Sequence, residues 1–351
     1  MKIKSYIFIL LITVIIFSLI AFSTNAAPNV KEDKDIYIIF SEYSLVAPFH
    51  IAAAYGFAIQ LERMGIRSAV MDAGSVMQRQ LEMIDDAITR GASAIVIFPM
   101  DSDALSVAVK KCNEANIPVI SIDRSINGGI VTTTLQSDNV EAGRKVAREF
   151  VVQFKKKGLK EFNLIQLRGQ LGSSPSQDRD KGFWEIMNLN PDIKVNLIAK
   201  AACEWDPAKA MEATLANLTA HPEINAIYYE ADTMAPGIFA AIDQLGLLVP
   251  QSDPKHIING GVDGDKHGLE SIRSGLMDVD ISQMPHSQGM IAAYLAYHAV
   301  KYGSEGLPSQ LFFDTQTLTP ENISSFGSSL WGDLPIGGAK IPDELKKLLL
   351  K

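Results

Sequence analysis

Residues 117–124 read Ile-Pro-Val-Ile-Ser-Ile-Asp-Arg, an apolar run that ends in an acid beside a guanidinium. A short run that is apolar at nearly every position is typical of a strand buried on both faces, as a parallel sheet requires. We therefore expect a strand at Pro118–Ile122. Similar runs recur at Ile36–Phe40, Ser68–Met71, Ala94–Phe98, Ile130–Thr133, Leu164–Leu167, Val195–Ala199, Ala226–Tyr229, Ile257–Asn259 and Val279–Ser282.

Helical patterns separate these runs. Apolar residues recur at helical spacing from Ile51 to Met64, where Gly65 ends the pattern, and Asp138 or Asn139 can cap a later helix. The alternation predicts an α/β fold with parallel sheets and right-handed crossovers. The strands are too many for one doubly wound domain, and no Pro- or Ser-rich linker divides the chain. We expect two lobes whose sheets face a common cleft, since open α/β sheets bind ligands beyond the carboxyl ends of their strands.

The first 26 residues have the three parts of an export signal. Lys2 and Lys4 form a positive start, an apolar run follows from Ile7 to Phe22, and Thr24-Asn25-Ala26 offers small residues to a signal peptidase. We expect cleavage after Ala26 and export to the periplasm. An uncleaved membrane anchor is the alternative, although the run is shorter than the roughly 20 residues that span a bilayer comfortably.

Composition and motifs restrict the function. The chain has 351 residues, and its 32 basic against 40 acidic side chains give a net charge of −8, which disfavours nucleic-acid binding. No Walker loop, GxGxxG, HExxH, CxxC or GxSxG motif occurs, and no histidine has metal-ligand spacing to a second His or Cys, so we expect no cofactor and no metal. Cys112 and Cys203 are expected to be buried free thiols rather than a disulfide.

Side chains suited to a polyol follow the predicted strands or begin the next helix. Vicinal hydroxyls match the forked donors of Arg and the twin acceptors of Asp, and the C–H faces of a sugar ring lie flat on aromatic rings. Acid–guanidinium neighbours would also keep such a pocket nearly neutral. The candidates are Phe49 with His50 beside it, Asp123, Arg124, Arg179, Trp205, Asp263 and Gln283.

Each candidate also has a plainer interpretation. Taken singly, these side chains are common in folded proteins, and only their shared position at strand ends favours a site. Asp263 could cap the next helix, Arg124 could form a surface ion pair, Phe49 or Trp205 could belong to the core, Arg179 could lie in a solvated charge cluster, and His50 could be an ordinary core or surface histidine.

The sequence resembles the periplasmic sugar-binding proteins of ABC transporters, of the ribose-binding kind, which share the fold of LacI-type repressor cores. The likeness extends from about Asp35 to Ile323. Its markers, in order, are Pro48-Phe49, Gly91-Ala92-Ser93-Ala94-Ile95 with Pro99 and Asp101, Ile117-Pro118-Val119 leading to Asp123-Arg124, Ser137-Asp138-Asn139, Ala142-Gly143, Arg179 with Gly182-Phe183, Trp205-Asp206, Asp232-Met234-Ala235-Gly237, Gly261-Val262-Asp263-Gly264 and Gln283-Met284-Pro285.

The resemblance implies a type I periplasmic binding protein, with two doubly wound parallel-sheet lobes joined by three crossing strands. The crossings are expected near Thr134–Ser137, Gln283–Pro285 and Asp314–Thr317. The amino-terminal lobe would hold residues 35–135 and 285–314. The carboxyl-terminal lobe would hold residues 136–283 and 315–335, and residues 336–351 would form a tail.

The resemblance also implies roles for the site residues. Phe49 and Trp205 would sandwich the sugar ring, with His50 where a second aromatic is common, while Asp123, Arg124, Arg179, Asp263 and Gln283 would bond its hydroxyls. One position departs from the family. Ala231, between Glu230 and Asp232, stands where the family usually carries a ligand-binding Asn. The missing Asn and His50 together suggest a polyol other than ribose, a furanose or sugar derivative, or a larger ligand. Glu42 and Tyr43 are possible added contacts.

The function expected from this likeness is capture of a sugar or polyol by a monomer that closes on it and delivers it to an ABC permease. A sensor that signals to a chemoreceptor or a histidine kinase is the alternative. A repressor would need a DNA-binding helix-turn-helix where this chain has an export signal. A glycosidase would use Asp123 and Asp263 as its carboxylate pair, but the neighbouring arginines argue against an acid of raised pKa.

Overall fold

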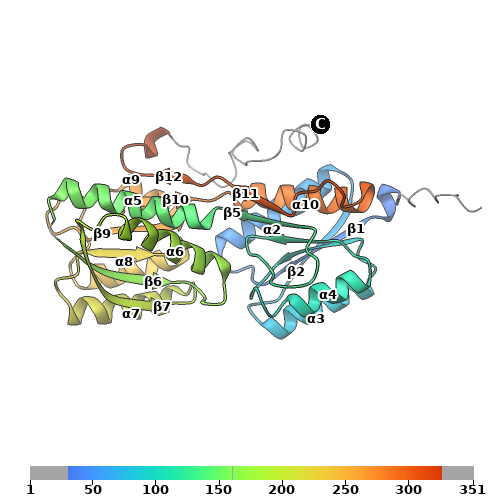
Figure 1. Ribbon diagram of the computed structural model, residues 1–351, viewed down its shortest axis with the longest axis horizontal. Helices are drawn as coiled ribbons and strands as arrows, with labels where there is room; N and C mark the ends of the chain where they lie inside the picture. The colour runs from blue at the N-terminus through green and yellow to red at the C-terminus, as the bar shows by residue number, and fades with distance from the viewer. Residues whose placement is uncertain (1–30, 160, 326–351) are drawn as a thin grey trace, which may run out of the picture. The chain divides into compact units, whose positions relative to one another are not determined.

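The computed structural model describes residues 31–159 and 161–325 (Figure 1). Its first sheet has the strand order β11-β5-β4-β3-β1-β2, and its second the order β12-β10-β9-β8-β6-β7. The predicted signal segment and tail lie outside the described residues. The strands of the first sheet are β1 (Tyr37–Glu42), β2 (Arg67–Asp72), β3 (Ala94–Phe98), β4 (Val119–Ile122), β5 (Thr133–Ser137) and β11 (Gln310–Phe313). Those of the second are β6 (Glu161–Arg168), β7 (Lys194–Ala202), β8 (Ala226–Tyr229), β9 (Ile258–Asp263), β10 (Val279–Ser282) and β12 (Gln316–Leu318).

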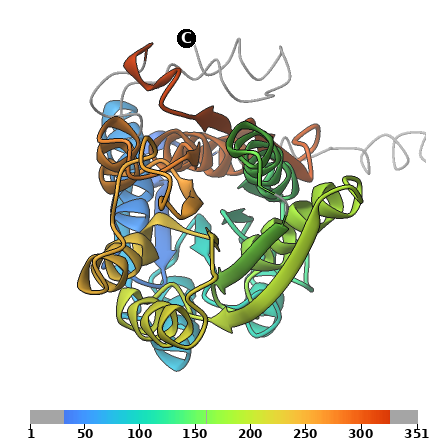
Figure 2. The same cartoon turned by 90° about the vertical axis from the view of Figure 1, so that its left-hand side faces the viewer.

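Helices cover both faces of each sheet (Figures 1 and 2). They are α2 (Pro48–Arg63), α3 (Met77–Thr89), α4 (Ser106–Glu114), α5 (Asn139–Lys157), α6 (Ser174–Asn188), α7 (Pro207–Ala220), α8 (Ala235–Gln244), α9 (Lys266–Arg273) and α10 (Pro285–Tyr302), with short 3-10 turns at Asp33–Asp35, Asp232–Met234 and Ile323–Ser325. The described residues therefore form two α/β lobes, as the alternation of strand and helix patterns predicts. Among these helices, none has the length and apolarity to cross a membrane.

The chain passes between the two sheets three times within the described residues. It leaves the first sheet after β5, returns to it through α10 after β10, and leaves again between β11 and β12. Asp138 caps the helix after the first passage, because its side chain accepts a hydrogen bond from the main-chain N–H of Glu141 at 2.9 Å. Every strand pair in the described sheets is parallel except β10 and β12.

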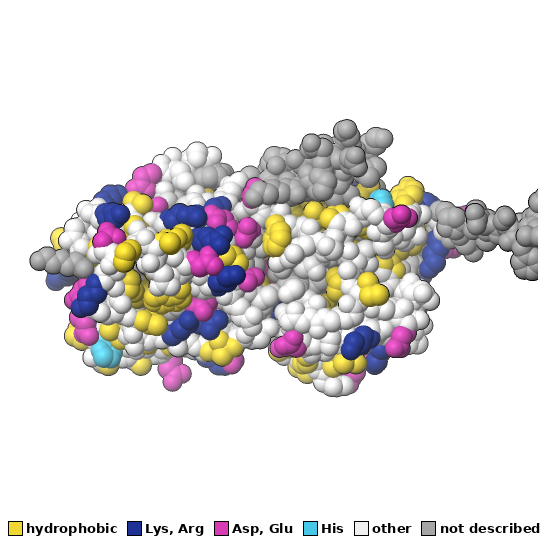
Figure 3. Space-filling model, in the orientation of Figure 1, with side chains coloured by type: hydrophobic (Ala, Val, Ile, Leu, Met, Phe, Trp, Pro, Cys, Tyr) yellow, Lys and Arg dark blue, Asp and Glu magenta, His cyan; other side chains and the backbone are white. Residues whose placement is uncertain are grey.

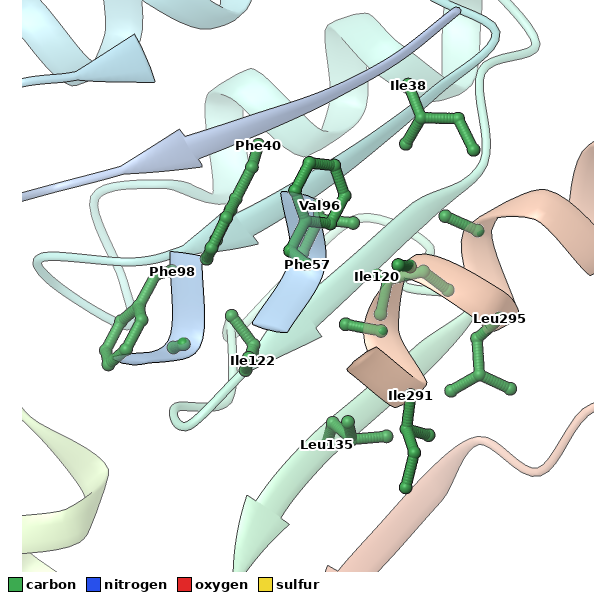
Figure 4. Close-up of a cluster of buried hydrophobic side chains, with 14 of the residues drawn as sticks. Ile38, Phe40, Phe57, Val96, Phe98, Ile120, Ile122, Leu135, Ile291 and Leu295 are labelled. Carbon is green, nitrogen blue, oxygen red and sulfur yellow. The ribbon is translucent and has the colours of Figure 1, made fainter. Parts of the chain in front are cut away.

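Side chains alternate between the two faces along each strand, so each sheet has an apolar core on both of its faces. In the first lobe, Ile38 and Phe40 pack with α2 and α10, as Figure 4 shows, while Ile39 points to the opposite cluster with α3 and α4. In the second lobe, Leu164 packs with α5 and α6, and Ile165 packs with α7, α8 and α9. Strands buried in this way leave only their ends free to bind a ligand.

Glycines let the helices that carry site residues lie very close to their neighbours. A Cβ on Gly56 of α2 would overlap the carbonyl of His286, and one on Gly289 of α10 would overlap the carbonyl of Ala53. Gly143 of α5 faces α6 in the same way, where its Cβ would overlap the carbonyl of Arg179. This close packing fixes the middle of α2 against α10 and the first turns of α6 against α5.

Two details of the strand prediction are wrong. The predicted strand Ile130–Thr133 is displaced, because Gly128 and Gly129, with φ of 136° and 72°, form a turn that leaves Ile130 73% exposed. The strand β5 begins only at Thr133. The all-parallel expectation also fails at β12, a short edge strand that pairs antiparallel with β10. The prediction of two buried free thiols, Cys112 and Cys203, is confirmed.

Candidate ligand-binding site

A cavity of about 270 Å³ lies between the lobes and is lined by residues of both. This volume lies just below the roughly 300–1,000 Å³ common for ligand pockets in proteins, so the cavity suits a single small molecule. The structure brings all nine candidate residues to its wall, namely Phe49, His50, Asp123, Arg124, Arg179, Trp205, Ala231, Asp263 and Gln283. Tyr43, Ser44, Val46, Ala47, Ser75, Phe98, Gln170, Pro175, Glu204, Asp206, Pro207 and Thr233 complete the lining.

Aromatic rings form the wall on the side of the first lobe. Phe49 is the second residue of α2, where Pro48 begins the helix, and its ring centroid lies 6.2 Å from that of Phe98. The ring of His50 lies 4.4 Å from Phe98 and 4.5 Å from Tyr43, both centroid to centroid. These rings are buried among themselves and still face the cavity, so Phe49 is both a core residue and a wall residue.

Asp123 and Arg124 lie directly beyond β4. Their ion pair, Nε of Arg124 to Oδ2 of Asp123, measures 3.4 Å, and the arginine is only 3% exposed. Arg124 also donates to the carbonyl of Met100 at 2.9 Å and to the Tyr43 hydroxyl at 3.0 Å. Its Nη1 donates to Oε1 of Gln170 at 3.1 Å, a contact from the first lobe to the second. Arg124 is therefore a buried wall residue and does not form a surface ion pair.

Arg179, Asp263 and Gln283 form a connected group in the second lobe. Arg179 projects from α6, donates through Nε to Asn139 at 2.9 Å and through Nη1 to the carbonyl of Glu230, and lies 3.7 Å from Oδ1 of Asp263. Gln283 donates from Nε2 to the same Oδ1 at 2.7 Å. Arg179 is 3% exposed, so the solvated-cluster interpretation is wrong. Asp263 does not cap α9, because Asp265 does.

Trp205 forms the aromatic wall on the side of the second lobe. Its ring lies against Gly169, where a Cβ would overlap the indole, and 5.7 Å from the guanidinium carbon of Arg179. The indole Nε1 is buried, and no hydrogen-bond partner for it occurs among the described residues. Because a buried donor without a partner costs about 1–3 kcal/mol, Nε1 is suited to receive an acceptor from a bound molecule.

The cavity wall concentrates backbone strain. Six residues other than glycine have positive φ in the described chain, and five of them line the cavity. Such conformations cost of order 1–3 kcal/mol each and cluster at functional sites, where the surrounding structure holds them. The five are Ser75, Asp123, Glu204, Trp205 and Asp263, with φ of 62°, 65°, 55°, 64° and 143°.

The comparisons with known proteins agree with this geometry. A family model described as a periplasmic binding protein domain matches residues 38–305. The chain belongs to the periplasmic binding protein family. It is 31% identical over 268 residues to the ribose import binding protein of Bacillus subtilis (strain 168), which covers 76% of this chain and 83% of the relative. It is 27% identical over 307 residues to the D-apiose import binding protein of Actinobacillus succinogenes (strain ATCC 55618 / DSM 22257 / CCUG 43843 / 130Z), covering 87% of this chain and 94% of that one.

Solved structures share the fold. A Caulobacter myo-inositol binding protein bound to myo-inositol superimposes with a TM-score of 0.75 at 24% identity, covering 85% of this chain and 97% of that one. A galactofuranose binding protein gives a TM-score of 0.75 at 22% identity, covering 83% and 96%. The prediction of a type I periplasmic binding protein fold is confirmed.

Three residues near the site of this periplasmic binding protein compare differently with the sequence-based expectations. Tyr43 does line the cavity, but Glu42 is fully buried behind the wall and does not. Gln170, which links the lobes through Arg124, was not predicted at all. It comes two residues after β6 ends at Arg168, so the rule that found the other strand-end residues would have found it too.

The carboxyl groups at the cavity have higher pKa values than the sequence led us to expect. Burial raises the pKa of Asp263 to about 8 although Arg179 lowers it, and burial also raises the pKa of Asp123 against the pull of Arg124. The expectation that the neighbouring arginines disfavour an acid of raised pKa is therefore wrong. It overlooked desolvation, which penalises a buried charge even beside a guanidinium.

Two further carboxyl groups, those of Asp232 and Asp280, are fully buried near Asp263. Both accept hydrogen bonds from the main-chain N–H of Gly264, at 3.0 and 3.1 Å. Burial raises the pKa of Asp280 to about 7, and burial together with the charge of Asp280 raises the pKa of Asp232 well above its usual value. Two such groups in one desolvated place do not both carry a charge at neutral pH.

These raised pKa values predict a direction for stability against pH. A carboxyl group whose pKa is higher in the folded state stabilises the fold below its ordinary pKa near 4, and loses that contribution as pH rises through the folded value. For Asp280 and Asp263 the loss begins near pH 4 and is complete at about pH 7 and about pH 8. We expect the melting temperature of the protein without added sugar to fall between about pH 5 and 8, as calorimetry would measure.

Variants identify the groups responsible. Asp280→Asn should flatten the pH dependence, whereas Asp192→Asn, at an exposed carboxylate, should leave it unchanged. A melting temperature that stays level or rises over this pH range would contradict the assignment of raised pKa values to the buried group.

Proposed function

We propose that this protein captures one sugar or sugar-like polyol in the cavity between its lobes and delivers it to an ABC importer. The observation that carries the proposal is the pairing at one cavity of an aromatic ring from each lobe, Phe49 and Trp205, with two acid–guanidinium pairs. Aromatic faces suit the C–H face of a sugar ring, and buried charged groups match several hydroxyls at once. Membership of the periplasmic binding protein family supports the same function.

Closure on the ligand follows from where these groups lie. Asp123 and Arg124 belong to the first sheet, and Arg179 and Asp263 to the second, so a bound sugar would contact both lobes at once. A ligand favours the conformation in which it makes more contacts, which here is the closed one. We propose the lobe bounds as residues 35–135 with 285–314 and residues 136–283 with 315–335, and the nine wall residues as the ligand contacts.

The setting of the proposed function is the periplasm. We propose that residues 1–26 are removed on export and that the mature protein acts as a monomer that docks on a permease. Charged side chains are numerous on the face shown in Figure 3, most densely over the second lobe. No step of this function requires chemistry on the sugar, so the proposal excludes catalysis.

A thermal-shift and calorimetry screen tests the function. The panel is D-ribose, D-apiose, D-allose, L-arabinose, D-galactose and myo-inositol. Because a ligand that binds only the folded state raises the melting temperature, we expect one of these to shift it and to bind with a stoichiometry of one. The sugar should be recovered unchanged after incubation. Failure of every compound to bind, or conversion of the sugar to a product, would contradict the proposal.

Position 231 predicts which sugar is disfavoured. Ala231 is buried at the cavity wall, where the family usually carries a ligand-binding Asn. A sugar hydroxyl that this amide would bond is left without a partner here, at a cost of about 1–3 kcal/mol. We expect Ala231→Asn to bind D-ribose at least tenfold more tightly than the wild type in calorimetry, about 1.4 kcal/mol. Ala231→Leu, which fills the same space without an amide, should not gain affinity, and equal gains in both variants would rule out the missing amide as the cause.

A further inference from the structure

Glu42, the last residue of β1, is fully buried and lies directly behind His50. Its Oε1 lies 2.9 Å from Nδ1 of His50. The same oxygen accepts the main-chain N–H groups of Tyr43 at 2.9 Å and Ser44 at 3.4 Å. Because two N–H groups already donate to Oε1, this oxygen is an acceptor. In its contact with His50, Nδ1 is therefore the donor and carries the proton.

The protonation of the pair follows from its surroundings. Burial raises the pKa of Glu42 well above its usual value, against its main-chain hydrogen bonds and Arg124, and burial together with Arg124 lowers the pKa of His50 well below its usual value. The charged or titratable groups facing the pair are Arg124, Asp123 and Tyr43. His50 is therefore neutral at pH 7, because its pKa lies below even the ordinary histidine value near 6.5. The other oxygen of Glu42, Oε2, is buried and has no hydrogen-bond partner among the described residues.

The His50 ring is held in place on its other sides. Tyr43 meets it edge-on at 4.5 Å, and Phe98 packs on it at 4.4 Å, both between centroids. The ring nevertheless lines the cavity. Nε2 makes no hydrogen bond within the described chain. It is also not one of the fully enclosed polar atoms that lack a partner, which agrees with its position beside the cavity. A neutral imidazole protonated on Nδ1 carries a free lone pair on Nε2.

We propose that Glu42 is a positioning residue that holds His50 as its neutral Nδ1–H tautomer, so that Nε2 accepts a hydrogen bond from a hydroxyl of the sugar. This rests on the proposed function and names a requirement of that site. A phenylalanine at position 50 would offer only an aromatic face, whereas His50 with Glu42 behind it selects a ligand with a hydroxyl at this point. A site built to bond a hydroxyl discriminates strongly against analogues that lack it, because its own polar atom is left unpaired.

Nitrogen NMR of protein labelled with 15N-histidine tests the tautomer without any ligand. The His50 signals are those missing from His50→Phe. We expect Nδ1 protonated, Nε2 unprotonated and no titration between about pH 5.5 and 8. His256 is an internal reference, because both of its ring nitrogens face an oxygen acceptor, whereas only Nδ1 of His50 does. Nδ1 of His256 lies 2.7 Å from the carbonyl of Val249, and Nε2 lies 2.9 Å from the carboxylate of Asp278. A His50 protonated on Nε2, or on both nitrogens at pH 7, would overturn the proposal.

Two substitutions separate positioning from simple packing. Glu42→Gln copies the shape of the side chain and keeps an acceptor oxygen, so it should keep the Nδ1–H tautomer. Glu42→Leu removes the acceptor, so the His50 signals should show a mixture of tautomers. Circular dichroism and melting curves check that both variants fold. If Glu42→Leu does not fold, the spectra of the wild type and Glu42→Gln still decide the tautomer, and loss of the Nδ1–H form in Glu42→Gln would overturn the proposal.

Calorimetry then tests the consequence for binding, with the member of the six-compound panel that the wild type binds most tightly. We expect His50→Phe and Glu42→Leu to weaken binding at least tenfold and Glu42→Gln to stay within about threefold. Glu82→Leu, at an exposed glutamate of α3, is the control and should bind as the wild type does. Wild-type affinity in His50→Phe would overturn the proposal. If no compound of the panel binds, the proposed function fails, and the NMR result alone decides the role of Glu42.

Discussion

Replacing Arg179 by alanine should weaken binding of the preferred sugar by at least a hundredfold. Arg179 is 3% exposed at the cavity wall, held by Asn139 and the carbonyl of Glu230 and lying 3.7 Å from Asp263. The substitution removes a forked donor from the sugar hydroxyls and from the buried network around Asp263. Each buried polar group that is left without its partner costs about 1–3 kcal/mol, and a hundredfold corresponds to about 2.7 kcal/mol.

Calorimetric titration of Arg179→Ala measures this effect. Arg144→Ala is the matched control, because Arg144 pairs with Glu185 at 2.6 Å on the outer side of the same two helices and is 35% exposed. Since Arg179 also joins α5, α6 and the end of β8, its loss should lower the melting temperature, although the protein should stay folded. A Kd within threefold of the wild type would remove Arg179 from the site.

Gly169→Val should weaken binding at least tenfold, about 1.4 kcal/mol, although position 169 carries no functional group. Even a Cβ at this position would overlap the Trp205 indole, so the ring must move away from its place at the cavity wall. Displacement of the ring loses its stacking on the sugar and disturbs the strained turn at Glu204 and Trp205, which hold φ of 55° and 64°.

A double-mutant cycle separates this steric effect from a general disturbance. If Gly169 acts only through Trp205, Gly169→Val should have little further effect on sugar affinity in a Trp205→Ala background. Fluorescence of the indole should also change in Gly169→Val. Additive losses of binding free energy in the double variant would show that Gly169 acts through something other than the ring.

Much of the fold could be predicted because buried parallel strands are apolar at nearly every position. Runs such as Ala94–Phe98 match the observed strand, and the apolar spacing before Gly65 matches α2. The failures have local causes. The two glycines at 128 and 129 shift the start of β5, and β12 is too short to leave a periodic pattern.

The site could be predicted in part because ligand residues of open α/β sheets follow the strands. Position along the chain was enough to find Asp123 and Asp263. It could not reveal that burial outweighs the arginines in setting the pKa of Asp263, because desolvation depends on the packed structure. The role of Glu42 and the fit of Gly169 against Trp205 were hidden for the same reason, since both depend on contacts between distant parts of the sequence.

The central claim is that one sugar binds between the lobes in contact with both. A crystal structure of the protein with the panel sugar that it binds tests this most directly. We predict a single ring between Phe49 and Trp205, with its hydroxyls within hydrogen-bond distance of Asp123 and Arg124 on one side and of Arg179 and Asp263 on the other. A sugar bound outside this cavity, or one that contacts a single lobe, would contradict the account.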